Sequence, residues 1–284
     1  MENLLQQADV QELINIALRE DIGSGDHSSL ACISANKKGT AYCTAKDDGV
    51  ICGLPLAKYI FQQVDSSLIF TTTFKDGDSI KKGDTVFTVE GKSISILTAE
   101  RLVLNFCQRL SGVATQSKNI STLLKDYHTK VLDTRKTTPG MRLFEKYAVK
   151  IGGSYNHRIG LYDMIMLKDN HIDFAGGIAQ AIDQTHAYLK QNNLDLKIEI
   201  ETRSLDEVKQ VLAKGGVNRI MLDNFTPALL KEAITLINKQ YETEASGGIT
   251  QATITDFAAS GVDYISVGAL THSAKSIDLS LKVM

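Results

Sequence analysis

Hydrophobic residues recur along the chain with two different periods, and the change between them separates an N-terminal from a C-terminal part. Residues 1–30 carry apolar side chains at helical spacing, and the turn residues GSGD end that pattern. Residues 39–98 alternate apolar and polar positions between Gly and Asp turn signals, which predicts a β-rich segment. Helical spacing returns over residues 99–115. We therefore expect helices and a sheet in the N-terminal part, with a domain boundary in or just after the last helix.

The C-terminal part repeats a short apolar run that is mostly followed by a segment of helix length, such as SLDEVKQVLAKGG or TPALLKEAITLINK. The runs are VLDTRK (131–136), MIMLKDNH (164–171), KIEIET (197–202), RIMLDN (219–224), EASGGI (244–249) and YISVGAL (264–270). This alternation predicts a parallel sheet, and the spacing of the later runs is typical of a (β/α) barrel. Each run carries a charged residue or a glycine near its carboxyl end. In such barrels the chemistry lies at the carboxyl ends of the strands, so these endings are the first candidates for a site.

The composition limits the classes of protein to consider. With 284 residues and 43% hydrophobic residues, the chain can form one large or two moderate domains. The net charge of −2 gives no sign of a nucleic-acid or membrane partner, and no apolar run approaches the about 20 residues that cross a bilayer. The N-terminus lacks the pattern of a signal peptide. No CxxC spacing occurs, which predicts buried, reduced thiols, no zinc site and a cytoplasmic location; the cysteines are Cys32, Cys43, Cys52 and Cys107.

Positive charge is concentrated between residues 130 and 172, where eight Lys or Arg residues accompany four acidic residues, a local balance of 8 − 4 = +4. Such a segment attracts anionic ligands, with Arg suited to carboxylates and Lys to phosphates. We assign Arg142, Lys146 and Lys150 to the solvated surface of a helix. The candidates for anion binding follow strand-like runs or lie in a Gly-flanked loop; they are Arg135, Lys136, Arg158 and Lys168, with His157 as a further donor.

Two acidic residues, Glu201 and Asp223, end neighbouring predicted strands. Two carboxylates in such positions can hold a hard divalent cation together with ligand oxygens and water, and Mg2+ suits a pyrophosphate ligand. Salt bridges to the nearby cations are the alternative. After the last two predicted strands, small residues leave backbone N–H groups open to a phosphate, although a tight turn also explains them. These small residues are Ser246, Gly247, Gly248 and Gly268.

The same residues stand in blocks that resemble those of a known family. The block DTRKTTPGMRLFEKYAVKIGGSYNHRIGLYDMIMLKDNHI (133–172) is similar to the central signature of the quinolinate phosphoribosyltransferases. Further blocks match in the expected order, namely REDIGSGDHSS, AERLVLNFCQRLSGVAT, EIETRSLDEV, IMLDNFTP, EASGGI and YISVGALTHSAKSIDLSLK. The resemblance implies an α/β fold with two domains. These are an N-terminal α/β sandwich at 1–112, joined by a C-terminal helix at 272–284, and a seven-stranded, TIM-like α/β barrel at 113–271.

The resemblance also implies a reaction. The phosphoribosyl group of phosphoribosyl pyrophosphate (PRPP) is transferred to quinolinate with decarboxylation, which gives nicotinate mononucleotide, pyrophosphate and CO2. Arg135, His157 and Arg158 would bind the quinolinate carboxylates, while Lys136 and Lys168 would face carboxylate or phosphoribosyl oxygens. Mg2+ is the expected cofactor, and no organic cofactor is expected because the sequence contains no nucleotide-binding glycine motif.

The remaining roles are carried over in the same way. Glu201 and Asp223 would hold the ribose hydroxyls and Mg2+, and together with Lys136 and Lys168 they form the expected catalytic set. The family works as a homodimer, sometimes as a hexamer, and Arg101 would reach into the neighbouring subunit's site. The 5′-phosphate would be held by Ser246, Gly247, Gly248 and Gly268.

Three alternatives stay open on the residues. A sister phosphoribosyltransferase of the same fold, the ModD-like paralogue associated with molybdate uptake, is disfavoured by the intact DTRKTTPG block and HR pair. A Schiff-base aldolase would use Lys136 or Lys168 as a nucleophile. The segment FKDGDSIKKGDTVFTVEGKSISIL resembles the hairpins of biotinyl and lipoyl carrier domains, but Lys92 lacks the sequence context of a modified lysine.

Overall fold

The computed structural model describes residues 1–284, and these residues form two compact units. The first unit contains an antiparallel sheet and the second a parallel sheet, so the predicted α/β fold with two domains is confirmed. We expected residues 1–112 with 272–284 in one domain and residues 113–271 in the other, whereas the first unit also includes residues 113–119 and 137–153. The first unit comprises residues 1–119, 137–153 and 270–284, and the second comprises residues 120–136 and 154–269.

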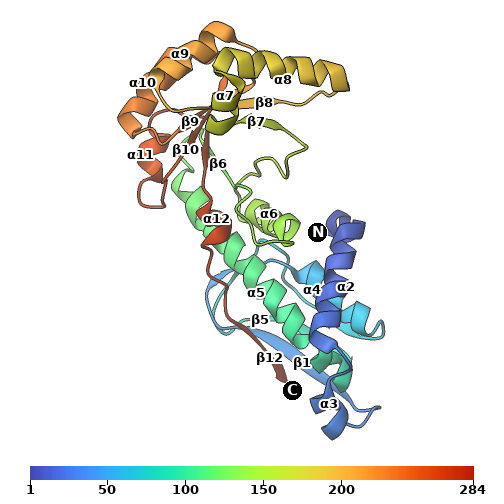
Figure 1. Ribbon diagram of the computed structural model, residues 1–284. Helices are drawn as coiled ribbons and strands as arrows, with labels where there is room; N and C mark the ends of the chain where they lie inside the picture. The colour runs from blue at the N-terminus through green and yellow to red at the C-terminus, as the bar shows by residue number, and fades with distance from the viewer. The chain divides into compact units, whose positions relative to one another are not determined.

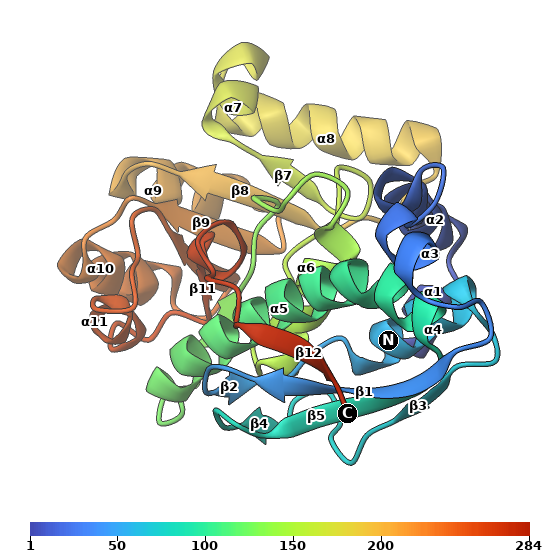
Figure 2. The ribbon, with the colours of Figure 1, turned by 90° about the horizontal axis from the view of Figure 1, so that it is seen from below.

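The first unit is built on a four-stranded antiparallel sheet in the order β12-β1-β5-β3 (Figure 2). Its alternating strands place one face in the core, where the rings of Phe61, Phe70 and Phe87 meet. The strands are β1 (Lys38–Ala45), β3 (Ile69–Thr71), β5 (Thr85–Lys92) and β12 (Leu279–Val283), with a separate pair of β2 (Gly49–Val50) and β4 (Ser79–Ile80). The β-rich prediction for residues 39–98 is confirmed for these strands.

Helices cover this sheet, and the longest of them is α5 (Figure 2). The helices are α1 (Glu2–Leu5), α2 (Ala8–Ile22), α3 (His27–Cys32), α4 (Leu54–Val64), α5 (Ser93–Leu123), α6 (Arg142–Ile151) and α12 (Ala269–His272). None of the helices in the structure combines the length and the apolar character that crossing a bilayer requires. Helix α4 was not expected from the β-rich pattern. Its start depends on Asp76, whose carboxylate accepts the N–H groups of Gly53 and Leu54 at 2.9 Å, a contact between residues far apart in sequence.

The predicted C-terminal helix at 272–284 is wrong. Residues Leu279–Val283 form strand β12, which pairs antiparallel with β1 in a register that aligns Ala41 with Val283. The exposed edge of β1 offers unpaired backbone groups, and the alternating sequence LSLKV places Leu279 in the core while it satisfies them. The helix was implied by the resemblance alone, whereas the alternation of the segment and its pairing with β1 favour a strand.

A buried ion pair holds the three segments of the first unit together. The guanidinium of Arg109 on α5 donates to Glu145 on α6 at 2.7 and 2.9 Å, and it also donates to the carbonyl oxygens of Thr271 and Ala274. Glu145 is fully buried, so this contact explains why residues 137–153 fold with the first unit. Lys146 on the same helix is 2% exposed, and its predicted solvated position is wrong.

The thiols follow the sequence prediction with one exception. Cys43, Cys52 and Cys107 are buried, and none of the cysteines forms a disulfide. Cys32 is exposed on α3, and the expectation of a buried thiol is wrong there because α3 is a short surface helix with a single buried residue, Ser29.

Close packing around α5 leads to a stability prediction. A Cβ atom added at Gly112 would overlap the backbone of Lys275 and lie 2.9 Å from the Cα atom of Ser276. We expect Gly112→Ala to lower the free energy of unfolding by about 1–3 kcal/mol, although alanine favours a helix by about 1 kcal/mol over glycine. Urea denaturation measures the change. Asn105→Ala on the exposed side of α5 is the control, and an unchanged midpoint for Gly112→Ala would contradict the packing described here.

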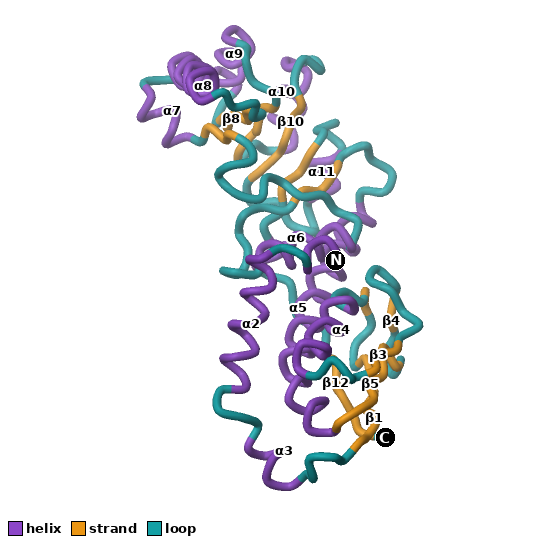
Figure 3. The backbone as a smooth tube through the Cα atoms, turned by 90° about the vertical axis from the view of Figure 1, so that its right-hand side faces the viewer, coloured by secondary structure: helices purple, strands orange, loops and turns teal.

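The second unit contains a parallel sheet in the order β6-β11-β10-β9-β8-β7, and all six predicted strands are present (Figure 1). The strands are β6 (Lys130–Leu132), β7 (Ile165–Leu167), β8 (Ile198–Thr202), β9 (Arg219–Asp223), β10 (Glu242–Ser246) and β11 (Tyr264–Ser266). Helices lie outside the curved sheet (Figure 3); they are α7 (Asp169–Ala175), α8 (Ile178–Asn192), α9 (Leu205–Lys214), α10 (Pro227–Ile237) and α11 (Ile254–Ala258). The carboxyl ends of all six strands therefore meet at one edge.

The seventh strand expected for the barrel is reduced to one residue. Tyr155 forms a single parallel bridge beside β6, donating its N–H to Val131 at 2.8 Å and accepting from Asp133 at 3.0 Å. Beyond Tyr155 the N–H of His157 donates to the carboxylate of Asp133 at 2.8 Å, and two N–H groups of the following loop donate to the carboxylate of Asp163 at 2.8 Å each. The sheet has six strands, with β6 and β7 at its two edges.

Candidate functional site

The polar residues predicted from sequence lie at the carboxyl ends of the parallel strands. Lys168 directly follows β7, Glu201 is the penultimate residue of β8, and Asp223 ends β9. Ser246 ends β10 and is aligned with Asp223, while Gly268 follows β11 by two residues. Because these strands are parallel neighbours, their ends form one continuous polar edge.

The carboxylates of this edge lie beside a lysine. The Nζ atom of Lys168 is 3.7 Å from Oε2 of Glu201. Burial raises the pKa of Glu201, the Lys168 ammonium opposes this effect, and the negative charge of Asp223 raises the pKa further. Two carboxylates that repel each other in this way offer oxygen ligands to a cation, so the donor set of Glu201 and Asp223 fits Mg2+.

Arg135 and Arg158 lie on two segments that meet at Asp133, namely the end of β6 and the loop after Tyr155. Arg135 and Lys136 are exposed beyond the end of β6. Asp133 is fully buried and accepts the N–H of His157 at 2.8 Å, which ties the loop carrying Arg158 to the end of β6. Burial lowers the pKa of Arg158, and the positive charge of Arg135 lowers it further, so the two guanidinium groups lie near each other. Two adjacent cations of this type favour a ligand with more than one negative charge.

In the loop after β10, the backbone of Ser246 and Gly247 lies against Asn224, the residue that follows β9. The N–H of Asn224 donates to the carbonyl oxygen of Ser246 at 2.8 Å, and the Asn224 amide donates to Asp223 at 2.6 Å. Gly247 has φ of 97°, and a Cβ atom there would overlap Asn224, so this position requires glycine. Gly248 has φ of 63° and open space around it. The loop thus leaves its backbone accessible, as a phosphate-binding turn requires.

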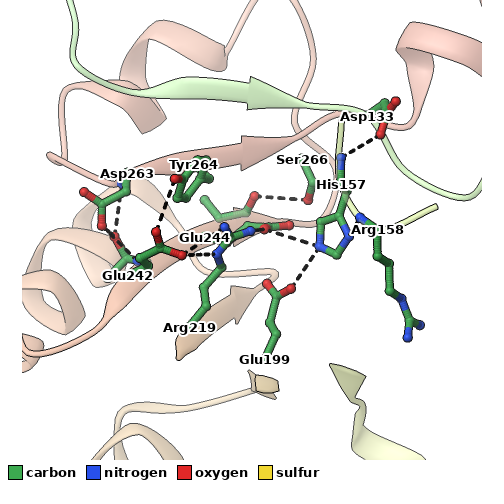
Figure 4. Close-up of polar contacts among 12 residues, drawn as sticks. Asp133, His157, Arg158, Glu199, Arg219, Glu242, Glu244, Asp263, Tyr264 and Ser266 are labelled. Atoms are coloured by element: carbon green, nitrogen blue, oxygen red, sulfur yellow. Dashed lines mark hydrogen bonds and ion pairs between the residues drawn. The ribbon is translucent and has the colours of Figure 1, made fainter. Parts of the chain in front are cut away.

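The His157 imidazole lies against two carboxylates of the same protein, those of Glu199 and Glu244. Its side chain is 6% exposed, and its Nε2 atom lies 2.9 Å from Glu199 and 3.5 Å from Glu244 (Figure 4). Its Nδ1 atom accepts the backbone N–H of Arg158 at 2.7 Å. The sequence predicts contact with a ligand carboxylate instead, and both ring nitrogens are directed elsewhere in this geometry.

The charge of His157 is set by these contacts. Burial lowers the pKa of the imidazole, whereas the carboxylates of Glu199 and Glu244 raise it. A doubly protonated ring could not accept the Arg158 N–H at Nδ1, so this direct contact assigns a neutral ring with its proton on Nε2, against the effect of the two carboxylates. Nε2 then lies 2.9 Å from Glu199 as a close polar contact.

Sequence reasoning missed the interior side chains of the sheet. Arg219 donates to Glu244 at 2.8 Å and to Glu242 at 3.0 and 3.2 Å, and Glu199 and Glu244 are fully buried. A signal was present in IEIET and ETEAS, where acids alternate within apolar strands. Acids at a period of two share one face, and inside a curved sheet that face points to the interior.

The same interior group has the composition of a metal site, since ligand atoms of His157, Glu199 and Glu244 lie within 4.8 Å of one another. However, Arg219 already donates to the oxygen of Glu244 that faces the imidazole. A guanidinium at that position competes with a metal ion, so we describe the group as an ion-pair network.

A hollow of about 950 Å³ opens at the opposite, amino-terminal ends of β9, β10 and β11. It is lined by His128, Tyr241 and Asp263 among others. None of the predicted site residues lines it, and barrel chemistry lies at the carboxyl ends. We therefore do not place the candidate site there. Arg101 is exposed on α5 of the first unit, where its side chain is accessible to a neighbouring molecule.

Comparisons with known proteins agree with the geometry. Family models described as quinolinate phosphoribosyl transferase, N-terminal domain and C-terminal domain, match residues 26–111 and 113–282. A mitochondrial quinolinate phosphoribosyltransferase (decarboxylating) 2b of Nicotiana tabacum is 45% identical over 97% of this chain and 82% of the relative. A probable nicotinate-nucleotide pyrophosphorylase (carboxylating) of Bacillus subtilis is 40% identical over 96% and 93%. The crystal structure of NadC from Streptococcus pyogenes is 42% identical, covers 97% of both chains and superposes with a TM-score of 0.91.

Proposed function

This chain belongs to the quinolinate phosphoribosyltransferase family, and from that premise we propose that it joins quinolinate to PRPP at the carboxyl-terminal edge of its parallel sheet. The products are nicotinate mononucleotide, pyrophosphate and CO2. The observation that carries the assignment to this edge is the convergence there of Lys168, Glu201 and Asp223 from three neighbouring strand ends.

The cations of the edge match the charges of the substrates. Quinolinate carries two carboxylates, and PRPP carries a phosphate and a pyrophosphate, so the two substrates repel each other. We propose that Arg135 and Arg158 bind the quinolinate carboxylates, and that Lys136 and Lys168 face carboxylate or phosphoribosyl oxygens. Fixed cations offset the repulsion and orient the ring nitrogen toward ribose C1.

The acidic residues would serve the PRPP side of the site. Glu201 and Asp223 would hold the ribose hydroxyls and Mg2+, which when bound would stabilise the negative charge of the pyrophosphate. Ser246, Gly247, Gly248 and Gly268 would receive the 5′-phosphate on a backbone that side chains leave open.

The bond changes then balance without another reagent. The ring nitrogen of quinolinate forms a bond to ribose C1 while the bond from C1 to pyrophosphate breaks. The bond between C2 and its carboxylate breaks, CO2 leaves, and the electron pair stays on C2, where the adjacent positively charged nitrogen stabilises it until C2 takes a proton from water. Lys136 and Lys168 would stabilise the charge that develops on the departing oxygens.

The alternative functions are not favoured. The curated relatives carry the names of quinolinate phosphoribosyltransferases and nicotinate-nucleotide pyrophosphorylases, which argues against the ModD-like paralogue. The Lys168 side chain is 49% exposed and ion-paired with Glu201, whereas a Schiff-base lysine needs a desolvated, neutral amine. Lys92 lies at the end of β5, directly before α5, and not at the tip of a carrier hairpin.

The assembly and location of the protein are also proposals. We propose a homodimer, with a hexamer as a larger form, in which Arg101 of each subunit completes the neighbouring site; its exposed position on α5 supports this role. We propose a cytoplasmic location on the basis of the unpaired cysteines. Some relatives are named mitochondrial or chloroplastic, so cell fractionation is the appropriate test.

A direct assay tests the proposed function. Incubation of the protein with quinolinate, PRPP and Mg2+ is expected to release nicotinate mononucleotide, pyrophosphate and CO2 in equal amounts, measured by chromatography and with carboxyl-labelled quinolinate. Nicotinate replaces quinolinate in the control reaction. Turnover of nicotinate without turnover of quinolinate would contradict the assignment.

A further inference from the structure

The parallel sheet contains a polar network that the proposed reaction does not use; its inner members Glu199 and Glu244 are fully buried, and its outer member Glu242 is 40% exposed. It starts at Tyr264, whose hydroxyl donates to Glu242 at 3.3 Å and whose ring lies 4.0 Å from the guanidinium of Arg219. Arg219 binds Glu242 and Glu244, and the network then reaches the imidazole between Glu244 and Glu199 (Figure 4). Burying this many charges is costly, so the network needs an explanation beyond stability.

The network ends at the backbone of Arg158. The His157 ring has Glu199 at 2.9 Å from Nε2, and its Nδ1 atom accepts the N–H of Arg158. The N–H of His157 is itself held by the buried carboxylate of Asp133. Two consecutive peptide N–H groups are therefore fixed by side chains, which leaves the chain around Arg158 little freedom.

The Arg158 side chain extends from this fixed backbone. In Figure 4 it points away from the imidazole, and its Nη1 atom donates to the carbonyl oxygen of Met164 at 3.0 Å. A bidentate contact between guanidinium and carboxylate depends strongly on angle, so the orientation of the backbone that carries it affects binding.

We infer that Glu199 is a positioning residue for quinolinate: through the His157 ring, it orients the backbone of Arg158 and hence the guanidinium that receives a substrate carboxylate. This inference rests on the proposed function. It assigns His157 an indirect role, and it gives a role to Glu199, which is fully buried and contacts the substrate edge only through other residues.

Kinetics of Glu199→Gln test the inference. The substitution keeps the shape of the side chain but removes the charge that orients the imidazole. We expect the KM for quinolinate to rise about tenfold, while kcat and the KM for PRPP stay within about twofold. The matched control is Thr202→Val on the same strand, because Thr202 is equally buried but donates to Met221 outside the network. The control is expected to leave both KM values unchanged.

A double-variant cycle separates positioning from a general effect on folding. Arg158→Ala alone is expected to raise the KM for quinolinate, and Glu199→Gln added to Arg158→Ala is expected to raise it no further, because the residue being positioned is gone. Full multiplication of the two effects would overturn the inference, as would an unchanged KM for quinolinate in Glu199→Gln or equal losses toward both substrates.

A second variant covers the case in which Glu199→Gln does not fold. His157→Gln keeps a donor and an acceptor but loses the rigid ring that holds the acceptor at the Arg158 N–H, and it is expected to raise the KM for quinolinate in the same selective way. A normal KM would overturn the inference. The wild-type assay keeps the two ideas apart: absence of quinolinate turnover in the wild type defeats the proposed function, whereas normal turnover with insensitive variants defeats only the positioning role.

Discussion

Replacing Glu201 by Gln or Asp223 by Asn is expected to lower kcat/KM for PRPP at least about a hundredfold at saturating quinolinate. Each substitution removes one of two neighbouring carboxylates at the substrate edge while keeping the size of the side chain. If the pair holds Mg2+ as proposed, the remaining carboxylate would bind it weakly, and in Glu201→Gln the Lys168 ammonium loses its ion-pair partner at 3.7 Å. Both effects weaken the hold on the sugar and on the pyrophosphate that leaves.

The Mg2+ dependence distinguishes this role from a general loss of structure. The concentration of Mg2+ that gives half-maximal rate is expected to rise in both variants, and added Mg2+ should recover part of the activity. Glu232→Gln removes one exposed acid from α10 and serves as the control. A variant with low activity but an unchanged Mg2+ requirement would show that Glu201 and Asp223 do not hold the metal.

Arg101→Ala is expected to abolish most of the activity, and a second inactive variant is expected to restore part of it by complementation. If Arg101 acts in the neighbouring subunit, a mixed dimer of Arg101→Ala with Arg135→Ala contains one intact site. Random pairing of equal amounts makes half of the dimers mixed, with one intact site of two, so about a quarter of wild-type activity returns.

The complementation experiment requires subunit exchange, which co-expression with two affinity tags provides. Doubly tagged dimers are all mixed, so they are expected to show about half of wild-type activity, and they are compared with each variant alone. Arg19→Ala, an exposed arginine on α2, replaces Arg101→Ala in the control pair and should show no loss by itself. Mixed dimers that stay as inactive as the single variants would place Arg101 within its own subunit's site or outside any site.

The sequence predicted the six parallel strands and the polar residues at their ends better than it predicted the terminal segments and the domain boundary. Six apolar runs became the six parallel strands because a buried parallel strand must be apolar over its length. Their polar endings could be placed together because all parallel strands end at the same edge. Lys168, Glu201 and Asp223 therefore lie where the pattern indicated. The blocks shared with the family supplied the reaction, which spacing alone did not reveal.

Contacts between distant residues decided the rest. The terminal segment around Leu279 is a strand because its backbone pairs with the edge of β1. Helix α4 begins where it does because the Asp76 carboxylate accepts the first N–H groups of the helix. The alternating acids of IEIET and ETEAS gave a signal for the interior network of Glu199, but the sequence did not show that His157 and Arg219 are the partners of these acids. The sequence by itself determined which residues are apolar, which strands form and which side chains stand at their ends, since these follow from local periodicity. Only the tertiary structure decided which charges are buried against one another, because burial of a charge depends on partners that come from other strands.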